Sequence, residues 1–197
     1  MAGFIRRVVT GHDKNGKSMI VSDGLAPIVN RDRTPRRGRR TTDLWVTTGM
    51  PVTVVPQEID PTLEPGNFIA PMGVKMRINE IAPEPPEVRK LPLAEALERL
   101  KPEESASSKP AATRGGHESP LHRTRTVDYA VVLEGEMTLY LDSGEIILKT
   151  GDVVIQRGTR HAWRNRSDKT VRMLYVLIDA RFDSELTRHF EAEPGHS

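Results

Sequence analysis

The feature that most constrains this chain is a series of short apolar segments, separated by turn residues, in its second half. Glycines and the sequence Asp142-Ser143-Gly144 interrupt the series at short, fairly even intervals. Segments of this length and spacing are typical of β-strands in a sandwich or a barrel. We therefore predict an all-β fold, with strands at 129–133, 137–141, 145–148, 153–156, 162–165 and 171–178.

The first part of the chain adds a hairpin and further strands. Asn15-Gly16 favours a tight hairpin turn, because both residue types tolerate positive φ, and we predict a hairpin over residues 4–22. The Thr- and Val-rich residues 41–55 predict one or two strands, and residues 68–81 contain another. These strands extend the β pattern toward the N-terminus.

Residues 82–115 break the β pattern. Leu91 to Leu100 predicts a short helix, because Leu93, Leu97 and Leu100 share one face. Residues 101–115 are rich in Pro, Ser, Ala and charge, which predicts a mobile loop that acts as a lid or has no function. Ser184 to Glu191 predicts a second short helix near the C-terminus.

Composition limits the class of protein. The chain has 197 residues, which fits one domain, and a formal net charge of +2. It has no cysteine, so disulfides, thiolate metal sites and a cysteine nucleophile are excluded. No secretory signal and no long apolar span is visible, so we expect a cytoplasmic protein without a membrane partner.

A cluster of six arginines lies between Arg31 and Arg40. Such a cluster can contact phosphate groups or an acidic partner. No aromatic residues interleave with the arginines to stack on bases. We therefore favour a solvated loop and expect no nucleic acid partner.

Two histidines and an aspartate have the pattern of a site inside such a barrel. His122 and Thr124 are two residues apart, so on a strand they face the same side, and Asp128 keeps this parity if no bulge intervenes. His161 comes from a distant strand. Two imidazoles and one carboxylate suit Fe(II), and Mn, Ni or Zn also accept them. Alternatively, each histidine is a satisfied core residue and Asp128 orients His122 by a hydrogen bond.

Strand parity also makes predictions for the neighbours of these residues. Trp163 shares the parity of His161 and can line the same pocket. Arg164 has the opposite parity, so we expect it to face solvent or a partner subunit. Tyr129 and Tyr140 lie on predicted strands, where we expect packing roles.

The first group of residues resembles a motif of the cupin family, which consists of small jelly-roll β-barrels. The family motif is Gly, five residues, His-x-His, three or four residues, Glu, six residues, Gly. The chain has the same spacing with Gly116, His122, Thr124, Asp128 and Gly135. Threonine thus stands in place of the second histidine, and aspartate in place of the glutamate.

A second group resembles the family's second motif, which is Gly, five residues, Pro-x-Gly, two residues, His, three residues, Asn. The chain supplies Gly151, Gly158, His161 and Asn165, without the proline and with a first interval one residue shorter. The two motifs cover about fifty residues, and the strand pattern from 67 to 180 extends the likeness to a whole barrel.

The resemblance implies a jelly-roll barrel, to which the residue patterns add an N-terminal hairpin arm and short helices in the insertion and at the C-terminus. The expected organisation is a single domain over residues 1–197. Within it we expect N-terminal strands and a basic loop at 1–66, a barrel core at 67–182 with an insertion at 83–115, and a helix and tail at 183–197.

The resemblance also implies one divalent metal ion, which can be Fe, Mn, Ni or Zn. The expected ligands are His122, Asp128 and His161. The expected substrate-binding residues are Thr124, Trp163 and Arg77. Arg77 alternates with apolar neighbours, so it can either reach into the barrel and hold a carboxylate or lie on the outer face.

Three functions follow as hypotheses. The first is a metal-dependent oxygenase or decarboxylase that acts on a small molecule in the barrel. The second is a metal-free barrel that binds or senses a small molecule. The third is a metal-free isomerase or epimerase with His161 as the base. The resemblance further implies a homodimer, in which the hairpin can pair with a sheet edge of the neighbour.

Overall fold

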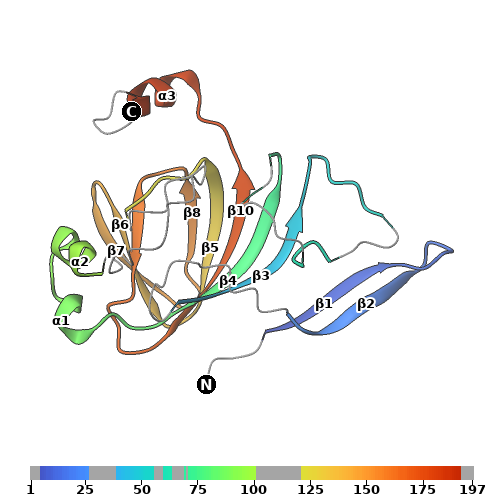
Figure 1. Cartoon of the computed structure of the whole chain (residues 1–197), viewed down its shortest axis with the longest axis horizontal. Helices are drawn as coiled ribbons and strands as arrows, with labels where there is room; N and C mark the ends of the chain where they lie inside the picture. Colours follow the sequence, from blue (N-terminus) through green and yellow to red (C-terminus); the bar gives the residue numbers. More distant parts are fainter. Residues whose placement is uncertain are drawn as a thin grey trace, which may run out of the picture.

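The strands form two facing β-sheets and a separate hairpin (Figure 1). This computed structural model describes residues 5–26, 39–55, 60–63, 69, 71–100 and 121–191. The five-stranded sheet has the order β3 (Arg39–Thr47), β4 (Val74–Ile81), β10 (Val171–Asp179), β5 (Thr126–Glu134) and β8 (Val153–Arg157). The three-stranded sheet has the order β7 (Gly144–Lys149), β6 (Glu136–Leu141) and β9 (His161–Arg164). The predicted all-β jelly-roll fold is confirmed.

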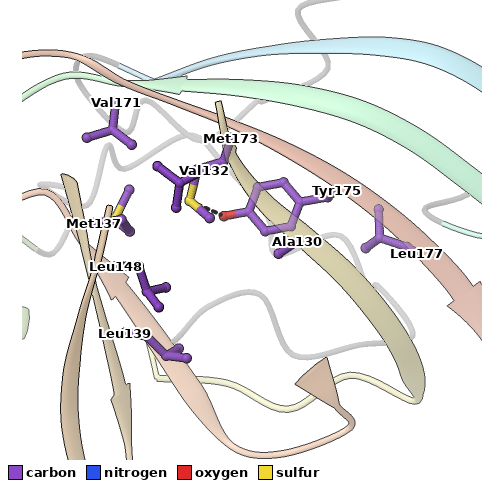
Figure 2. Close-up of a cluster of buried hydrophobic side chains, with 9 residues drawn as sticks. All are labelled: Ala130, Val132, Met137, Leu139, Leu148, Val171, Met173, Tyr175 and Leu177. Atoms are coloured by element: carbon purple, nitrogen blue, oxygen red, sulfur yellow. Dashed lines mark hydrogen bonds between the residues drawn. The ribbon is translucent and has the colours of Figure 1, made fainter. Parts of the chain in front are cut away.

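The main apolar core lies between the two sheets (Figure 2). Side chains alternate along β10, where every second residue from Val171 to Leu177 is buried. β5 alternates in the same way from Thr126 to Val132. The buried members of the core are Ala130, Val132, Met137, Leu139, Leu148, Val171, Met173, Tyr175 and Leu177. Residues of both sheets therefore interdigitate with the period of two that a strand imposes.

The outer face of the larger sheet carries an ion-pair network at one end. Glu80 on β4 pairs with Arg40 on β3 and, at 3.0 Å, with Arg172 on β10. Arg39 and Arg40 begin β3, so the prediction of a solvated arginine loop is wrong for these two residues. The other four arginines of the cluster lie outside the described residues. Because β3 pairs with β4, the boundary expected after residue 66 separates two strands of one sheet.

Apolar side chains are exposed elsewhere on this outer face. Tyr129, Leu133, Val153 and Ile155 lie on β5 and β8, and β8 is an edge strand of the sheet. Tyr129 is 44% exposed, so the expectation that it packs is wrong, whereas Tyr140 on β6 is buried as expected.

Two short helices confirm the predicted positions: α2 (Leu93–Arg99) lies in the insertion, and α3 (Ser184–Glu191) follows the last strand. A further short helix, α1 (Pro86–Arg89), precedes α2 and was not predicted. The loop predicted at 101–115 lies outside the described residues. In the described part of the chain, no helix has the length and hydropathy needed to cross a bilayer.

Arg164 fastens the α1–α2 segment to the smaller sheet. Its side chain is 1% exposed and donates three hydrogen bonds to the Glu84 carboxylate, from Nε at 2.9 and 3.1 Å and from Nη2 at 2.7 Å. It also donates to the carbonyl oxygens of Val88 and Leu91. The prediction that Arg164 faces solvent or a partner is wrong, because the helical segment covers β9 at this point.

The hairpin of β1 (Arg6–His12) and β2 (Ser18–Leu25) extends away from the two sheets (Figure 1). It confirms the hairpin predicted from Asn15-Gly16 and continues past residue 22. At its base, Arg7 donates a hydrogen bond to the carbonyl oxygen of Leu44 at 3.0 Å. Its exposed apolar residues are Val8, Met19, Ile20, Val21 and Leu25.

We predict that Arg164→Met lowers the free energy of unfolding by about 3–5 kcal/mol, because the substitution leaves the Glu84 carboxylate buried without its partner. Urea denaturation followed by circular dichroism measures the change. The double variant Arg164→Met/Glu84→Leu should recover most of the loss, since both charges are then absent. An equal loss in the single and double variants would show that the ion pair is not the cause.

We also predict that a second copy of the chain covers the hairpin, since exposed apolar surface and open sheet edges both favour association. Sedimentation velocity at micromolar concentration should show a dimer. Ile20→Lys should raise the dimer dissociation constant about ten- to a hundredfold by removing a buried apolar contact. Ser18→Lys, which adds the same charge to the same strand, should have little effect. A monomeric wild-type chain would contradict this prediction.

Candidate functional site

His122 and His161 are brought together by an antiparallel backbone bridge. The N–H of each residue donates to the carbonyl oxygen of the other at 2.9 Å. The two ring centroids are 4.5 Å apart. The bridge joins the segment before β5, in the larger sheet, to β9 in the smaller sheet. Two imidazoles from distant parts of the chain therefore lie side by side.

The hydrogen bonding of His161 defines its tautomer. Its Nδ1 lies 2.9 Å from the carbonyl oxygen of Thr159. A carbonyl can only accept a hydrogen bond, so Nδ1 carries the proton and Nε2 of the neutral ring keeps a lone pair. Burial lowers the pKa of His161, which favours the neutral ring. Nε2 can therefore accept a proton or bind a metal ion.

Asp128 lies on the inner face of β5 and is 6% exposed. Burial raises the pKa of its carboxyl group, against smaller opposing effects from the Thr126 hydroxyl and the charges of His161 and Arg77. Its Oδ1 is buried and has no hydrogen-bond partner within the described ranges. An oxygen of this kind can accept a hydrogen bond from a bound molecule.

Thr124 has the predicted parity with Asp128 but a local partner. It is buried, and its hydroxyl hydrogen-bonds to the hydroxyl of Thr126 at 2.8 Å. Because either oxygen can donate, the pair can pass on a hydrogen bond toward Asp128. Its expected role in substrate binding stays a prediction.

Aromatic side chains continue the site into the core. The Trp163 ring lies edge-on to the rings of His161 and Tyr175, with centroid distances of 5.9 and 5.8 Å. Burial raises the pKa of Tyr175 to about 12, so its hydroxyl stays protonated. That hydroxyl donates to the sulfur of Met173 at 3.2 Å (Figure 2), and a thioether is a weak acceptor.

Arg77 lies on the inner face of β4, which answers the question that the sequence left open. It pairs in register with Tyr175, and its Cζ lies 6.0 Å from the centroid of that ring. Burial lowers the pKa of its guanidinium group. Its charge also acts on Asp128, so Arg77 belongs to the same polar region.

Sequence reasoning did not single out three residues of this region: Arg39, Asn79 and Tyr175. Asn79 and Tyr175 share the parity of Arg77 and Met173 on their strands, and that parity was the available signal. Strand parity gives no signal for Arg39, because the arginine cluster predicts a loop at this position. His117, which lies in the first motif region, is outside the described residues.

The candidate metal centre is incomplete in the part of the chain that the structure describes. Two neutral imidazoles and a carboxylate are suitable donors for a divalent ion. However, the described residues contain no group of three or more His, Asp or Glu side chains close enough to hold one. The ligand set of His122, Asp128 and His161 therefore stays a prediction.

The motif glycines allow backbone conformations with positive φ. Gly135, Gly151 and Gly158 have φ values of 88°, 94° and 60°, which favour glycine. At Gly158 a Cβ atom would lie 2.6 Å from the Phe182 ring, so this turn also needs the space. These three glycines therefore allow the turns, and Gly116 lies outside the described residues.

Comparison with known protein families matches the segment that contains both histidines. The family Cupin_2, described as Cupin domain, matches residues 113–177. Phomopsin biosynthesis cluster protein C' of Diaporthe leptostromiformis is 57% identical over 70 residues, which are 34% of this chain and 37% of that protein. The cupin-domain-containing oxidoreductase srdD of Neurospora crassa is 46% identical over 70 residues, 34% of this chain and 36% of that protein. The match thus spans little more than a third of the length of these relatives.

The chain also has low similarity to solved structures. The cupin domain of Schizosaccharomyces pombe Cnp3 covers 98% of each chain, with 12% identity and a TM-score of 0.40. A cupin barrel protein from Salinispora arenicola covers 83% of this chain and 94% of that one, with 15% identity and a TM-score of 0.37.

We predict that Asp128→Asn raises the free energy of unfolding at neutral pH and leaves it unchanged in acid. The pKa of Asp128 is raised above 3.8 by folding, so this carboxyl group favours the folded state only while it is protonated. That contribution is lost as the pH rises through the folded pKa, whereas asparagine stays neutral. Denaturation of both proteins across acid and neutral pH measures the difference. The exposed Asp142→Asn is the control, and a gain independent of pH would contradict the assignment.

Proposed function

We propose that this protein is an enzyme that acts on a small organic molecule between its two sheets, and the match of residues 113–177 to the Cupin domain family supports this. The observation that carries the proposal is the placement of His161 next to His122 and in electrostatic contact with Asp128, all on inward positions. The names of the relatives support a small-molecule substrate, since several are biosynthesis cluster proteins.

The reaction class that this site supports best is proton transfer. The hydrogen bond from Nδ1 to the Thr159 carbonyl leaves Nε2 of His161 as a base. Asp128 places an unpartnered carboxyl oxygen in the same region. The lowered pKa of His161 and the raised pKa of Asp128 bring two ordinarily distant values closer together, which suits an acid–base pair. Isomerisation or epimerisation next to a carbonyl group needs such a pair.

The second candidate is the metal-dependent oxygenase or decarboxylase predicted from the sequence. It is favoured by relatives that are named cupin-domain-containing oxidoreductases. His122, Asp128 and His161 supply suitable donor atoms, although the described residues do not complete a three-ligand group. Stoichiometric metal in the purified protein is the property that separates this candidate from the first.

Hydrogen–deuterium exchange tests the first candidate. We predict that the protein, treated with a chelator, incorporates solvent deuterium next to the carbonyl group of one or more members of a panel of small carbonyl compounds, as followed by NMR. His161→Gln should slow the exchange about a hundredfold or more, because it removes the base. His12→Gln, in the exposed hairpin, is the matched control. Exchange that survives in His161→Gln would overturn the assignment of the base.

Metal analysis decides the second candidate. Tag-free wild type and His161→Ala are compared by elemental mass spectrometry, before and after loading with Fe(II), Mn, Ni or Zn. A stoichiometric metal that is lost in the variant would favour the metal-dependent enzyme. Saturable binding of small molecules without exchange, metal or turnover would instead identify a binding or sensing barrel.

A further inference from the structure

We propose that the inner face of β3, β4 and β10 binds the carboxylate group of the small molecule, through Arg39, Asn79 and Tyr175 beside Arg77. This inference rests on the proposed function, because it names the chemical class of ligand for the same site. The residues of the carboxylate site lie on other strands than His161 and Asp128. An experiment can therefore refute the carboxylate site and the acid–base pair separately.

Asn79 is the first observation. Its side chain is fully buried on β4, at 0% exposure, and neither its Nδ2 nor its Oδ1 has a hydrogen-bond partner among the described residues. Leaving such a group unpaired costs free energy, and most buried polar groups in proteins have a partner. An amide in this state is therefore available to donate to an acceptor on a bound molecule.

Two neighbours also offer hydrogen-bond donors. The Nε–H of Arg39 is buried and has no acceptor within the described ranges. The hydroxyl of Tyr175 donates to the sulfur of Met173, which a stronger oxygen acceptor could replace. Asn79, Arg39 and Tyr175 can thus each donate to an oxygen acceptor, and a carboxylate supplies two oxygens that accept several hydrogen bonds.

The strand register places these donors in one patch. Asn79 pairs with Met173 across β4 and β10, and Arg77 pairs with Tyr175 one step further along. On the other side, Arg39 pairs with Ile81, diagonally next to Asn79 and within reach of a long side chain. The charge of Arg39 acts on both Arg77 and Tyr175, which agrees with this placement.

The charges on this inner face favour a monoanion. Lys75 and Asp43 form a buried ion pair at 2.8 Å and offset one another. Among the described residues, Arg39 and Arg77 bring two further positive charges to this region, and Asp128 brings one negative charge. A carboxylate is complementary in sign to this set. A guanidinium group also matches the planar geometry of a carboxylate.

NMR titration of the full chain tests the inference, with benzoate as the probe because Trp163 and Tyr175 line the same interior. Benzoate should bind saturably, while benzamide, which has the same shape without the charge, should bind about ten- to a hundredfold more weakly. Arg39→Gln and Asn79→Leu should each weaken benzoate binding at least about tenfold. Arg157→Gln, which removes an exposed arginine from β8, should leave it unchanged.

Thermal denaturation shows whether each variant is folded. Asn79→Leu should keep or raise Tm, because it removes an unpaired buried amide while preserving volume. Benzamide binding as tightly as benzoate, unchanged affinity in both Arg39→Gln and Asn79→Leu, or tighter binding of inorganic phosphate would each overturn the inference. His161→Gln should keep benzoate binding. If His161→Gln loses deuterium exchange but still binds benzoate, the result supports His161 as the base and is independent of the carboxylate site. If the wild-type protein shows exchange but does not bind benzoate, only the carboxylate site is refuted.

Discussion

Burial of the two inner sheet faces against one another is the constraint on which the rest of the structure depends. Alternation along β4, β5 and β10 puts every second residue inside, whatever its polarity. At one end the inward neighbours are Val171, Ile81 and Met173. At the other end Leu177 pairs with both Lys75 and Asp128. The same interior thus holds an apolar core and a polar region, and Arg39 and Asn79 extend the polar region to the positions that pair with Ile81 and Met173.

The polar region is positioned by backbone hydrogen bonds. The bridge between His122 and His161 joins a segment that leads into the larger sheet to a strand of the smaller one. Main-chain groups make this connection, so it does not use the imidazole rings. The ring of His161 makes a separate contact, the hydrogen bond from its Nδ1 to the Thr159 carbonyl. A frame of main-chain hydrogen bonds that fixes the positions of side chains suits a functional site.

The sequence predicted the elements better than their surroundings. The hairpin at Asn15-Gly16 and the strand alternation could be predicted because turn chemistry and a period of two are local properties. Arg164 could not be placed, because parity shows which face a residue is on but not what covers that face. Arg39 was missed since a charged cluster conceals the start of a strand. The spacing of the two motifs correctly predicted that His122 and His161 lie together. It could not determine how closely Asp128 approaches them.

The contact between Arg164 and Glu84 has a consequence for reading mutational scans of this protein. His161 and Arg164 are the first and last residues of the four-residue strand β9. The strand that presents the imidazole is thus anchored on its reverse side to the α1–α2 segment. Substitutions at Glu84 or in the helical turns would disturb the proposed site without touching a bound molecule. Sensitivity in that segment would then report the support of the site rather than a second place of recognition.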